Sequence, residues 1–162
     1  MHRASELIDR YTSYAAFVLM TVMTIVIAIQ VFYRYVLSSS LSWSEELARY
    51  LFIWTVMLMA SSGVKHGFHV AITFIRDKLP IKMQNIFALL GSILMFAFAV
   101  VLVVFGIRLA WATRIQLSPA MRLSMFWVYL SVPVSGCLIV IHESDRLLRI
   151  FSHLLGLHKV GG

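Results

Sequence analysis

Long apolar stretches alternate with short polar segments along the whole chain. Residues 11–33, 83–107 and 123–142 contain no Lys, Arg, Asp or Glu, and residues 47–64 are interrupted only by Arg49. A helix of about 20 predominantly apolar residues is long enough to cross a bilayer. The pattern therefore predicts an all-α integral membrane protein with four transmembrane helices over these ranges. We expect residues 1–162 to form a single transmembrane domain.

Two of the polar segments have the pattern of short helices that lie in the membrane interface. In residues 65–80, Phe68, Ile72 and Ile75 recur at helical spacing among basic and histidine side chains. Residues 108–122 are expected to form a second interfacial segment of this kind. The side chains expected to meet lipid headgroups near the first segment are Lys65, His66, His69, Arg76, Lys78 and Lys82.

Proline and glycine mark two further features of the predicted helices. Pro133 lies inside the fourth apolar range, where the missing backbone N–H predicts a kink. Gly91 and Gly106 lie in the third range, where small residues allow another helix to approach closely.

Composition supports the membrane assignment, and the distribution of charge predicts an orientation. Apolar residues make up 60% of the chain and charged residues 13%, whereas a soluble domain has about a quarter charged residues. The net charge of +7 comes from basic residues at the ends of the apolar ranges, so we expect no nucleic-acid partner. Nine basic residues lie on the side of the termini and residues 65–82, against five on the other side. Both termini are therefore predicted to be cytoplasmic.

A polar cluster precedes the second apolar range and allows two interpretations. Ser42 and Glu45 have the spacing of a helix capping box, and Glu45 can pair with Arg49 along one helix face. This interpretation leaves Glu46 without a role. The alternative is that one carboxylate and Arg34 contact a partner subunit. The full set of interface candidates is Arg34, Tyr35, Trp43, Glu45, Glu46, Arg49, Tyr50 and Trp54.

The predicted helices carry no charged residue near their centres, which limits the functions open to the chain. A transporter that works alone normally has ionisable groups or broken helices near the midplane. No nucleophile–base pair or phosphate-binding loop is recognisable, so an enzyme is not expected. The chain has six histidines, but they lack metal-ligand spacing, and we expect no metal or cofactor. A membrane-anchor subunit of a redox complex, or a small oligomeric exporter, remains an alternative.

Three motifs around the second apolar range resemble those of a known family. They are Arg34-Tyr35, the series Trp43-Ser44-Glu45-Glu46-Leu47-Ala48-Arg49-Tyr50, and Gly67-Phe68-His69-Val70. Together with the length and the four apolar ranges, they resemble the small, DctQ-like membrane subunit of tripartite ATP-independent periplasmic (TRAP) transporters. Two positions depart from the family pattern: Met59 stands where glycine is usual, and Thr73 where aspartate is common.

The resemblance implies a subunit of a three-part importer in the bacterial inner membrane. In this family a periplasmic binding protein captures an organic acid such as a C4-dicarboxylate or sialic acid. A large membrane subunit then moves the acid with a sodium gradient. The small subunit binds the large subunit and enlarges its fixed scaffold. The partners implied here are therefore the large subunit, the binding protein at least transiently, and membrane lipids.

Overall fold

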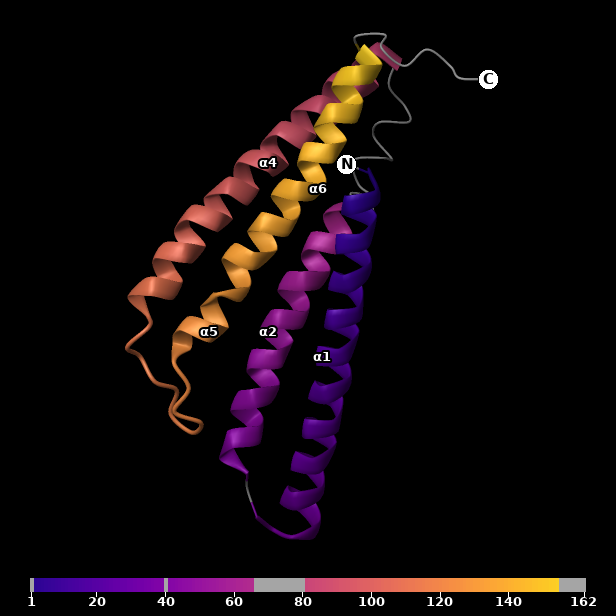
Figure 1. Ribbon diagram of the computed structural model, residues 1–162. Helices are drawn as coiled ribbons and strands as arrows, with labels where there is room; N and C mark the ends of the chain where they lie inside the picture. The colour runs from indigo at the N-terminus through magenta and orange to yellow at the C-terminus, as the bar shows by residue number, and fades with distance from the viewer. Residues whose placement is uncertain (1, 40, 66–80, 155–162) are drawn as a thin grey trace.

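The computed structural model describes residues 2–39, 41–65 and 81–154. Within these ranges the chain is mostly helical, with no strand beyond one isolated bridge pair (Figure 1). The helices are α1 (His2–Val36), α2 (Ser42–Lys65), α4 (Ile81–Ala112), α5 (Met125–Tyr129) and α6 (Ser131–Leu154). Four of the described segments are long and apolar enough to span a membrane: Ser5–Val36, Ser42–Lys65, Leu89–Ala112 and Phe126–Leu148. The prediction of an all-α protein with four spanning helices is confirmed.

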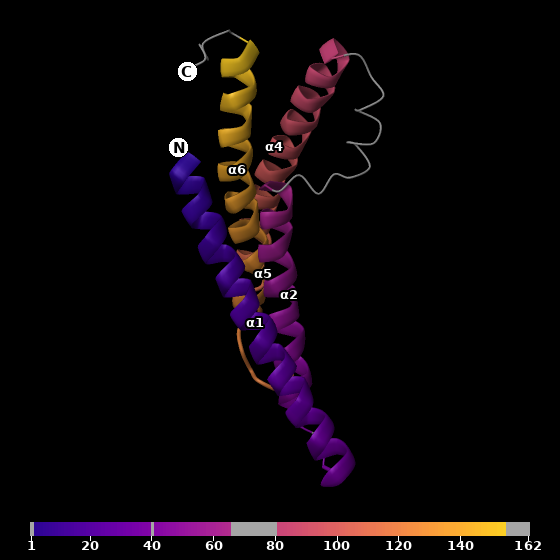
Figure 2. The same ribbon diagram turned by 90° about the vertical axis from the view of Figure 1, so that its right-hand side faces the viewer.

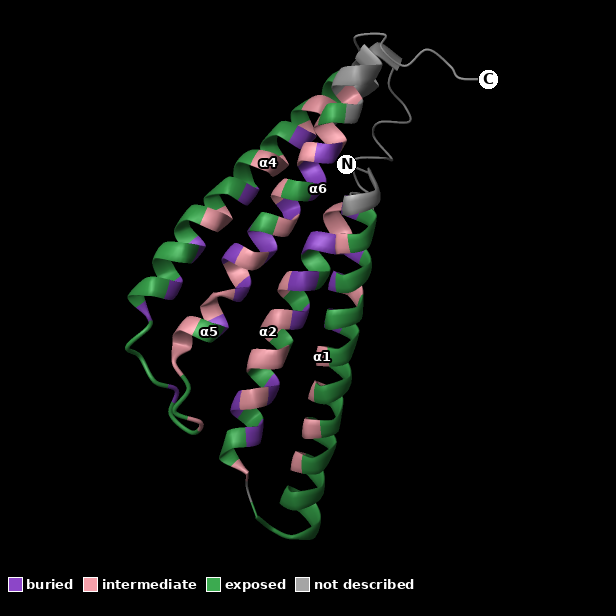
Figure 3. Ribbon diagram, in the orientation of Figure 1, coloured by how far each residue is buried: buried purple, intermediate pink, exposed green. Residues whose placement is uncertain are grey.

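The spanning helices form an open row and not a closed bundle. Helix α2 packs against α1 on one side and α6 on the other, and α4 packs against the far side of α6. Within the described ranges α1 and α4 do not contact each other. Burial follows this order: buried positions gather along α2 and α6, while α1 and α4 are mostly exposed (Figure 3).

Helix α1 contacts the rest of the chain through a single stripe. The stripe recurs at spacings of three and four residues through Asp9, Thr12, Ala16, Leu19 and Met23. This is the spacing at which one face of a helix meets a neighbouring helix. Most of the remaining α1 side chains are exposed and apolar, including Phe17 and Ile25. Such side chains suit lipid tails or another membrane subunit.

Glycine and proline bring α4 and α6 close together. A Cβ atom on Gly106 would lie 2.8 Å from Pro133 Cδ, and one on Gly136 would lie 2.9 Å from Val103 Cγ2. Gly106 is thus a contact point as predicted. Gly91 is not, because nothing lies within 4 Å of its Cβ position. The helix is interrupted at Leu130, between α5 and α6, because Pro133 has no N–H to donate to the carbonyl of Tyr129.

The second interfacial segment differs from the prediction. Helix α4 continues through Ala112, and residues 113–124, here called the hairpin loop, form a folded connection to α5 instead of a helix. An unbroken helix cannot run through these residues, because Pro119 cannot donate a backbone hydrogen bond and Arg122 adopts a left-handed φ of 52°. The first predicted interfacial segment lies largely outside the described residues.

Figures 1 and 2 show how the ends of the helices are arranged. The start of α1, the end of α2, the start of α4 and the end of α6 lie toward one end, here called the termini end. The end of α1, the start of α2 and the hairpin loop lie toward the other, here called the hairpin end.

Candidate functional site

Glu46 joins the second turn of α2 to the hairpin loop. Its Oε2 accepts hydrogen bonds from the backbone N–H groups of Ala120 (2.9 Å) and Met121 (2.8 Å). Its Oε1 accepts a hydrogen bond from the hydroxyl of Tyr50, one helical turn further on. The Tyr50 hydroxyl also lies 3.6 Å from Met125 Sδ, at the start of α5. Glu46, to which the capping interpretation gave no role, therefore accepts three hydrogen bonds from groups of its own chain.

The hairpin loop has a defined backbone structure of its own. The N–H of Ser118 donates to the carbonyl of Leu123 at 2.8 Å, and the N–H of Arg122 donates to the carbonyl of Ser118 at 3.1 Å. The Ser118 side chain accepts from the N–H of Leu123 (3.2 Å), and the Ser124 hydroxyl donates to the carbonyl of Arg114 (2.7 Å). The loop therefore meets Glu46 as a preformed turn, whose N–H groups at its tip are satisfied by the carboxylate.

A groove of about 480 Å³ lies where α2, the hairpin loop and α5 meet. Glu45, Glu46, Arg49 and Tyr50 line the α2 side. Pro119, Ala120, Met125, Val128 and Tyr129 line the opposite side. Six of the eight interface candidates lie on α2, and four of these six line the groove.

The structure does not show the capping box expected for Ser42 and Glu45, or the ion pair expected between Glu45 and Arg49. Helix α2 begins at Ser42 near the predicted place, but Ser42 is already helical, and in the described chain no bond joins it to Glu45. The Ser44 hydroxyl instead donates to the carbonyl of Leu41 at 2.7 Å. Glu45 and Arg49 are both exposed, and no ion pair links them within the residues that the structure describes. Their charged groups are thus available at the edge of the groove.

The other interface candidates are spread over the hairpin end. The indole Nε1–H of Trp54 donates to the carbonyl of Trp127 at 3.1 Å, which ties α2 to α5. Trp43 is exposed at the start of α2. Arg34 and Tyr35 are exposed at the end of α1 and do not line the groove. The structure therefore separates these two residues from the cluster around Glu46.

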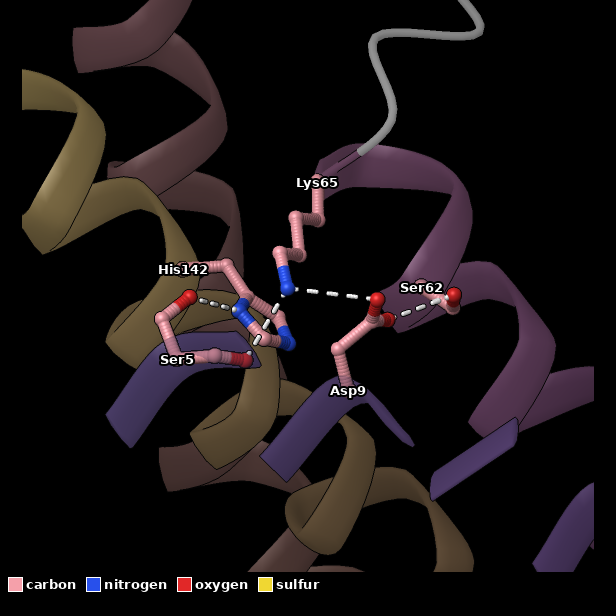
Figure 4. A network of polar contacts seen from close by, with 5 residues as sticks. All are labelled: Ser5, Asp9, Ser62, Lys65 and His142. Atoms are coloured by element: carbon pink, nitrogen blue, oxygen red, sulfur yellow. Dashed lines mark hydrogen bonds and ion pairs between the residues drawn. The ribbon is translucent and has the colours of Figure 1, made fainter. Parts of the chain in front are cut away.

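A second polar region lies at the termini end, where α1, α2 and α6 meet (Figure 4). We call it the Asp9 network, and its members are Ser5, Asp9, Ser62, Lys65 and His142. Lys65 Nζ lies 3.2 Å from Asp9 Oδ2 and donates to the carbonyl of Ser5 at 3.0 Å. The Ser62 hydroxyl donates to Asp9 Oδ1 at 2.7 Å, and Ser5 Oγ is hydrogen-bonded to His142 Nδ1 at 3.0 Å.

The Asp9 network gives Lys65 a different environment from the one expected at a lipid interface. The Lys65 and Asp9 side chains are only 19% and 12% exposed, so the ion pair is largely enclosed by the chain. Lys82 lies in the first turn of α4, while His66, His69, Arg76 and Lys78 fall outside the described residues. Nothing in the spacing of the sequence relates His142 to Ser5, which lies 137 positions earlier.

Charge in the described helices lies in two zones, one at the hairpin end and one around the Asp9 network. No group of three or more potential metal ligands occurs in the described part of the chain. Two more buried carboxylates lie on α6 close to His142. They are Asp145 and Glu143, and Glu143 Oε1 lies 3.4 Å from Arg146 Nη1. The stretches between these two zones carry no Lys, Arg, Asp or Glu, and the four long apolar helices define a multi-pass membrane protein.

Comparison with known proteins identifies the family. Residues 23–153 match the family model described as tripartite ATP-independent periplasmic transporters, DctQ component. The chain therefore belongs to this family, which is a family of transport proteins and not of enzymes. The resemblance drawn from the three motifs is confirmed.

Individual relatives carry names from the same transporter class. The chain is 30% identical over 138 residues to the sialic acid TRAP transporter small permease protein SiaQ of Vibrio cholerae, covering 85% of this chain and 80% of the relative. It is 30% identical over 132 residues to the isethionate TRAP transporter permease protein DctMQ of Oleidesulfovibrio alaskensis. It is 31% identical over 111 residues to the sialic acid TRAP transporter permease protein SiaT of Haemophilus influenzae.

The last two relatives are much longer than this chain. The match covers 76% of this chain but 20% of DctMQ, and 68% of this chain but 18% of SiaT. In each of them a region similar to this chain is thus part of a larger permease polypeptide.

Proposed function

We propose that this chain is the small scaffold subunit of a TRAP transporter and binds a large transport subunit in the membrane. The two long relatives support this proposal, because each carries a similar region on one polypeptide with a much longer remainder. Fusion of two regions in one polypeptide keeps them at a high effective concentration, which favours their association. The apolar helix centres fit a scaffold better than an independent transporter.

The surface that we assign to the large subunit is one stripe on α2, here called the α2 seam. It consists of Glu45, Arg49, Phe52, Val56 and Met59, all exposed, at alternating spacings of four and three residues. Helix α2 is otherwise packed between α1 and α6, so the seam is the part of this inner helix that is left open. A stripe with this period is the surface against which another membrane helix packs.

Arg49 is the observation that carries the assignment. It lies about two helical turns inside α2, beyond Ser42. It is exposed, and no described carboxylate pairs with it, because Glu46 is bound to the hairpin loop. A guanidinium at this depth is costly beside lipid tails unless it reaches headgroups, water or an acceptor. We assign that acceptor, a carboxylate or a set of carbonyls, to the large subunit at the groove.

The finer parts of the proposal concern the whole transporter. We propose that it lies in the bacterial inner membrane with both termini of this chain in the cytoplasm, as the excess of basic residues on that side favours. A periplasmic binding protein would then deliver an organic acid at the hairpin end, and a sodium gradient would drive uptake through the large subunit. The names of the relatives support sialic acid and isethionate as solutes to test, and the family resemblance adds C4-dicarboxylates.

The test is co-purification of this chain with a large TRAP transporter subunit produced together with it. We expect Arg49→Glu to reduce the co-purified large subunit about tenfold, because it leaves an acceptor facing a like charge. Sodium-driven uptake in proteoliposomes that also receive the binding protein should fall in parallel. The matched control is Arg10→Glu, the same charge reversal at an exposed position near the termini end of α1.

The two variants separate the possible outcomes. Normal assembly and uptake with Arg49→Glu would remove the α2 seam from the proposed interface. Solute uptake by this chain alone, without the large subunit, would overturn the scaffold role itself.

A further inference from the structure

The hairpin loop and the residues that flank it carry an unusual combination of exposed side chains. Ile115 is 80% exposed, and Leu117 is 61% exposed. Trp111 at the end of α4 and Trp127 in α5 flank the loop and are exposed to a similar extent. Two arginines, Arg114 and Arg122, are exposed among them. We call these six residues the hairpin surface. Ile115 and Leu117 lie outside the spanning helices, where such exposed apolar side chains need a covering partner.

Charge on the hairpin surface has one sign. Residues 81–142 contain no Asp or Glu, so the loop has no acidic side chain of its own. The carboxylate that reaches it, Glu46, is fully engaged with the N–H groups of the loop tip and with Tyr50. The Arg114 guanidinium lies over the Trp111 ring, 4.5 Å from its centroid. This cation–π pair holds a positive charge beside an apolar surface and leaves its N–H donors free for an anion.

The loop lies beside the helices and does not project beyond them. Its tip is hydrogen-bonded to Glu46, in the second turn of α2. In both Figure 1 and Figure 2 the end of α1 reaches further out than the hairpin loop does. That end of α1 is itself exposed and largely apolar, with Phe32 and Val36. If α1 spans the bilayer to its end, the hairpin surface is level with the membrane interface and not with the surrounding water.

We propose that the hairpin surface is a lipid-binding surface that selects anionic phospholipid headgroups in the leaflet at the hairpin end. Arg114 and Arg122 would bind the headgroup phosphates, while Ile115, Leu117 and the two tryptophans enter the boundary between headgroups and acyl chains. Each group suits its place: tryptophan favours the interface, and arginine binds phosphate through a planar set of donors. Glu46 acts as a positioning residue, because it holds the loop at this depth.

A soluble protein partner fits these observations less well. Such a partner would approach from water, whereas the loop is set back from the end of α1. Whenever such a partner dissociated, apolar side chains as exposed as Ile115 would be left in water. A leaflet covers the surface permanently.

Two fluorescence measurements on the purified full chain test the proposal. Ile115→Cys, made in a Cys137→Ser background and labelled with an environment-sensitive dye, reports the surroundings of the loop. The chain is reconstituted in phosphatidylcholine vesicles with either phosphatidylglycerol or phosphatidylcholine carrying a nitroxide near the headgroup end of one acyl chain. We expect both lipids to quench the dye and a water-soluble nitroxide to quench it weakly. At equal lipid fraction we expect labelled phosphatidylglycerol to quench more strongly.

Arginine variants then test the origin of the lipid preference. Removing one arginine near a membrane surface is expected to reduce preference for an anionic lipid by up to about fivefold. Arg114→Gln with Arg122→Gln should therefore bring the two lipids close to equal quenching. Arg34→Gln, the same loss of charge at the hairpin end but off the hairpin surface, should preserve the preference. High salt should abolish the preference in the unsubstituted loop, which tests the charge argument without a folding risk.

Three results would overturn the proposal. The first is equal quenching by both lipids at low salt, which would mean that the surface does not select charge. The second is strong quenching by the water-soluble agent and none by either lipid, which would place the loop in water and favour a soluble protein partner. The third is an Arg34→Gln effect as large as that of the loop variants, which would make the preference a general effect of net charge.

Discussion

The two polar ends of this molecule are built in different ways. At the hairpin end one carboxylate, Glu46, accepts hydrogen bonds from two backbone N–H groups of a loop and from Tyr50 of its own helix. At the termini end an ion pair and two hydroxyl bonds connect side chains of α1, α2 and α6 to one another. One end thus holds a loop in place, and the other holds three helices in register.

The difference shows how a membrane protein without charge at its centre can still fix its shape. Packing of apolar side chains between helices is hardly more favourable than packing against lipid tails. Polar contacts and close approach of backbones therefore contribute more of the specificity of helix packing. The Asp9 network supplies that specificity to α1, α2 and α6, and Glu46 supplies it to the hairpin loop. Each end can therefore be disturbed separately.

The largest effect is expected at the hairpin end, from Glu46→Ala. This change leaves the N–H groups of Ala120 and Met121 without their acceptor and releases the loop from α2. In detergent we expect trypsin to cleave after Arg122 on the order of a hundredfold faster, because cleavage follows the population of the open loop. Glu45→Ala is the matched control, as Glu45 is exposed and makes no such bonds. Equal cleavage of the two variants would contradict the role given to Glu46.

The next effect belongs to the termini end. Lys65→Met leaves Asp9 without its ion pair in a setting where both side chains are mostly enclosed. We expect a loss of about 2 kcal/mol in the free energy of unfolding, below the value for a fully buried pair because some water reaches it. Asp9→Asn should cost a similar amount, and the double variant less than the sum of the two. Additive losses in thermal unfolding would show that Asp9 and Lys65 do not interact.

A smaller effect should come from the contact between α4 and α6, which lies between the two ends. The Cβ atom of Gly136→Ala would lie 2.9 Å from Val103 Cγ2 and 3.1 Å from the carbonyl oxygen of Ala99. We expect a net loss of about 1 kcal/mol, because overpacking outweighs the gain in helix propensity. Gly91→Ala has open space and should be neutral or slightly stabilising. A thermal unfolding series in which both variants behave alike would contradict this close contact.

The smallest effect is expected from Trp54→Phe. The substitution keeps an aromatic ring but removes the hydrogen bond from Nε1–H to the carbonyl of Trp127. We expect a loss of about 0.5 kcal/mol, near the lower limit for a single neutral hydrogen bond. Trp43→Phe, at an exposed position, is the control and should change nothing measurable. A larger loss for Trp43→Phe would mean that aromatic packing at the helix start matters more than the bond between α2 and α5.

Much of the fold could be predicted from the sequence because the signals are local. Absence of charge over a helix length is enough to identify a spanning helix, as with α1 and α4. The ends of helices were harder to predict: α4 continues to Ala112, beyond the expected range of 83–107. The hairpin loop was also missed, since the pattern of residues 108–122 is compatible with a helix until Pro119 and the left-handed Arg122 are considered.

The polar sites were predicted only in part. The sequence singled out Glu46 and Tyr50, whose spacing of four residues places them on one helix face, but not their contact with Ala120 and Met121 more than 70 residues later. It assigned Lys65 to the lipid interface because a lysine at a helix end usually extends there. The partner that changes this environment, Asp9, lies 56 positions earlier, and no local pattern connects the two.

Cross-linking along α2 tests most directly whether this chain binds a large subunit through the α2 seam. Single cysteines replace Arg49, Phe52, Val56 and Met59 in a Cys137→Ser background, each labelled with a photoreactive maleimide in membranes that contain both subunits. The comparison set is Ile25, Ile29 and Phe32, which are exposed on α1. We predict strong adducts with the large subunit at the seam positions and weak ones on α1. Adducts from α1 with none from the seam would contradict the account.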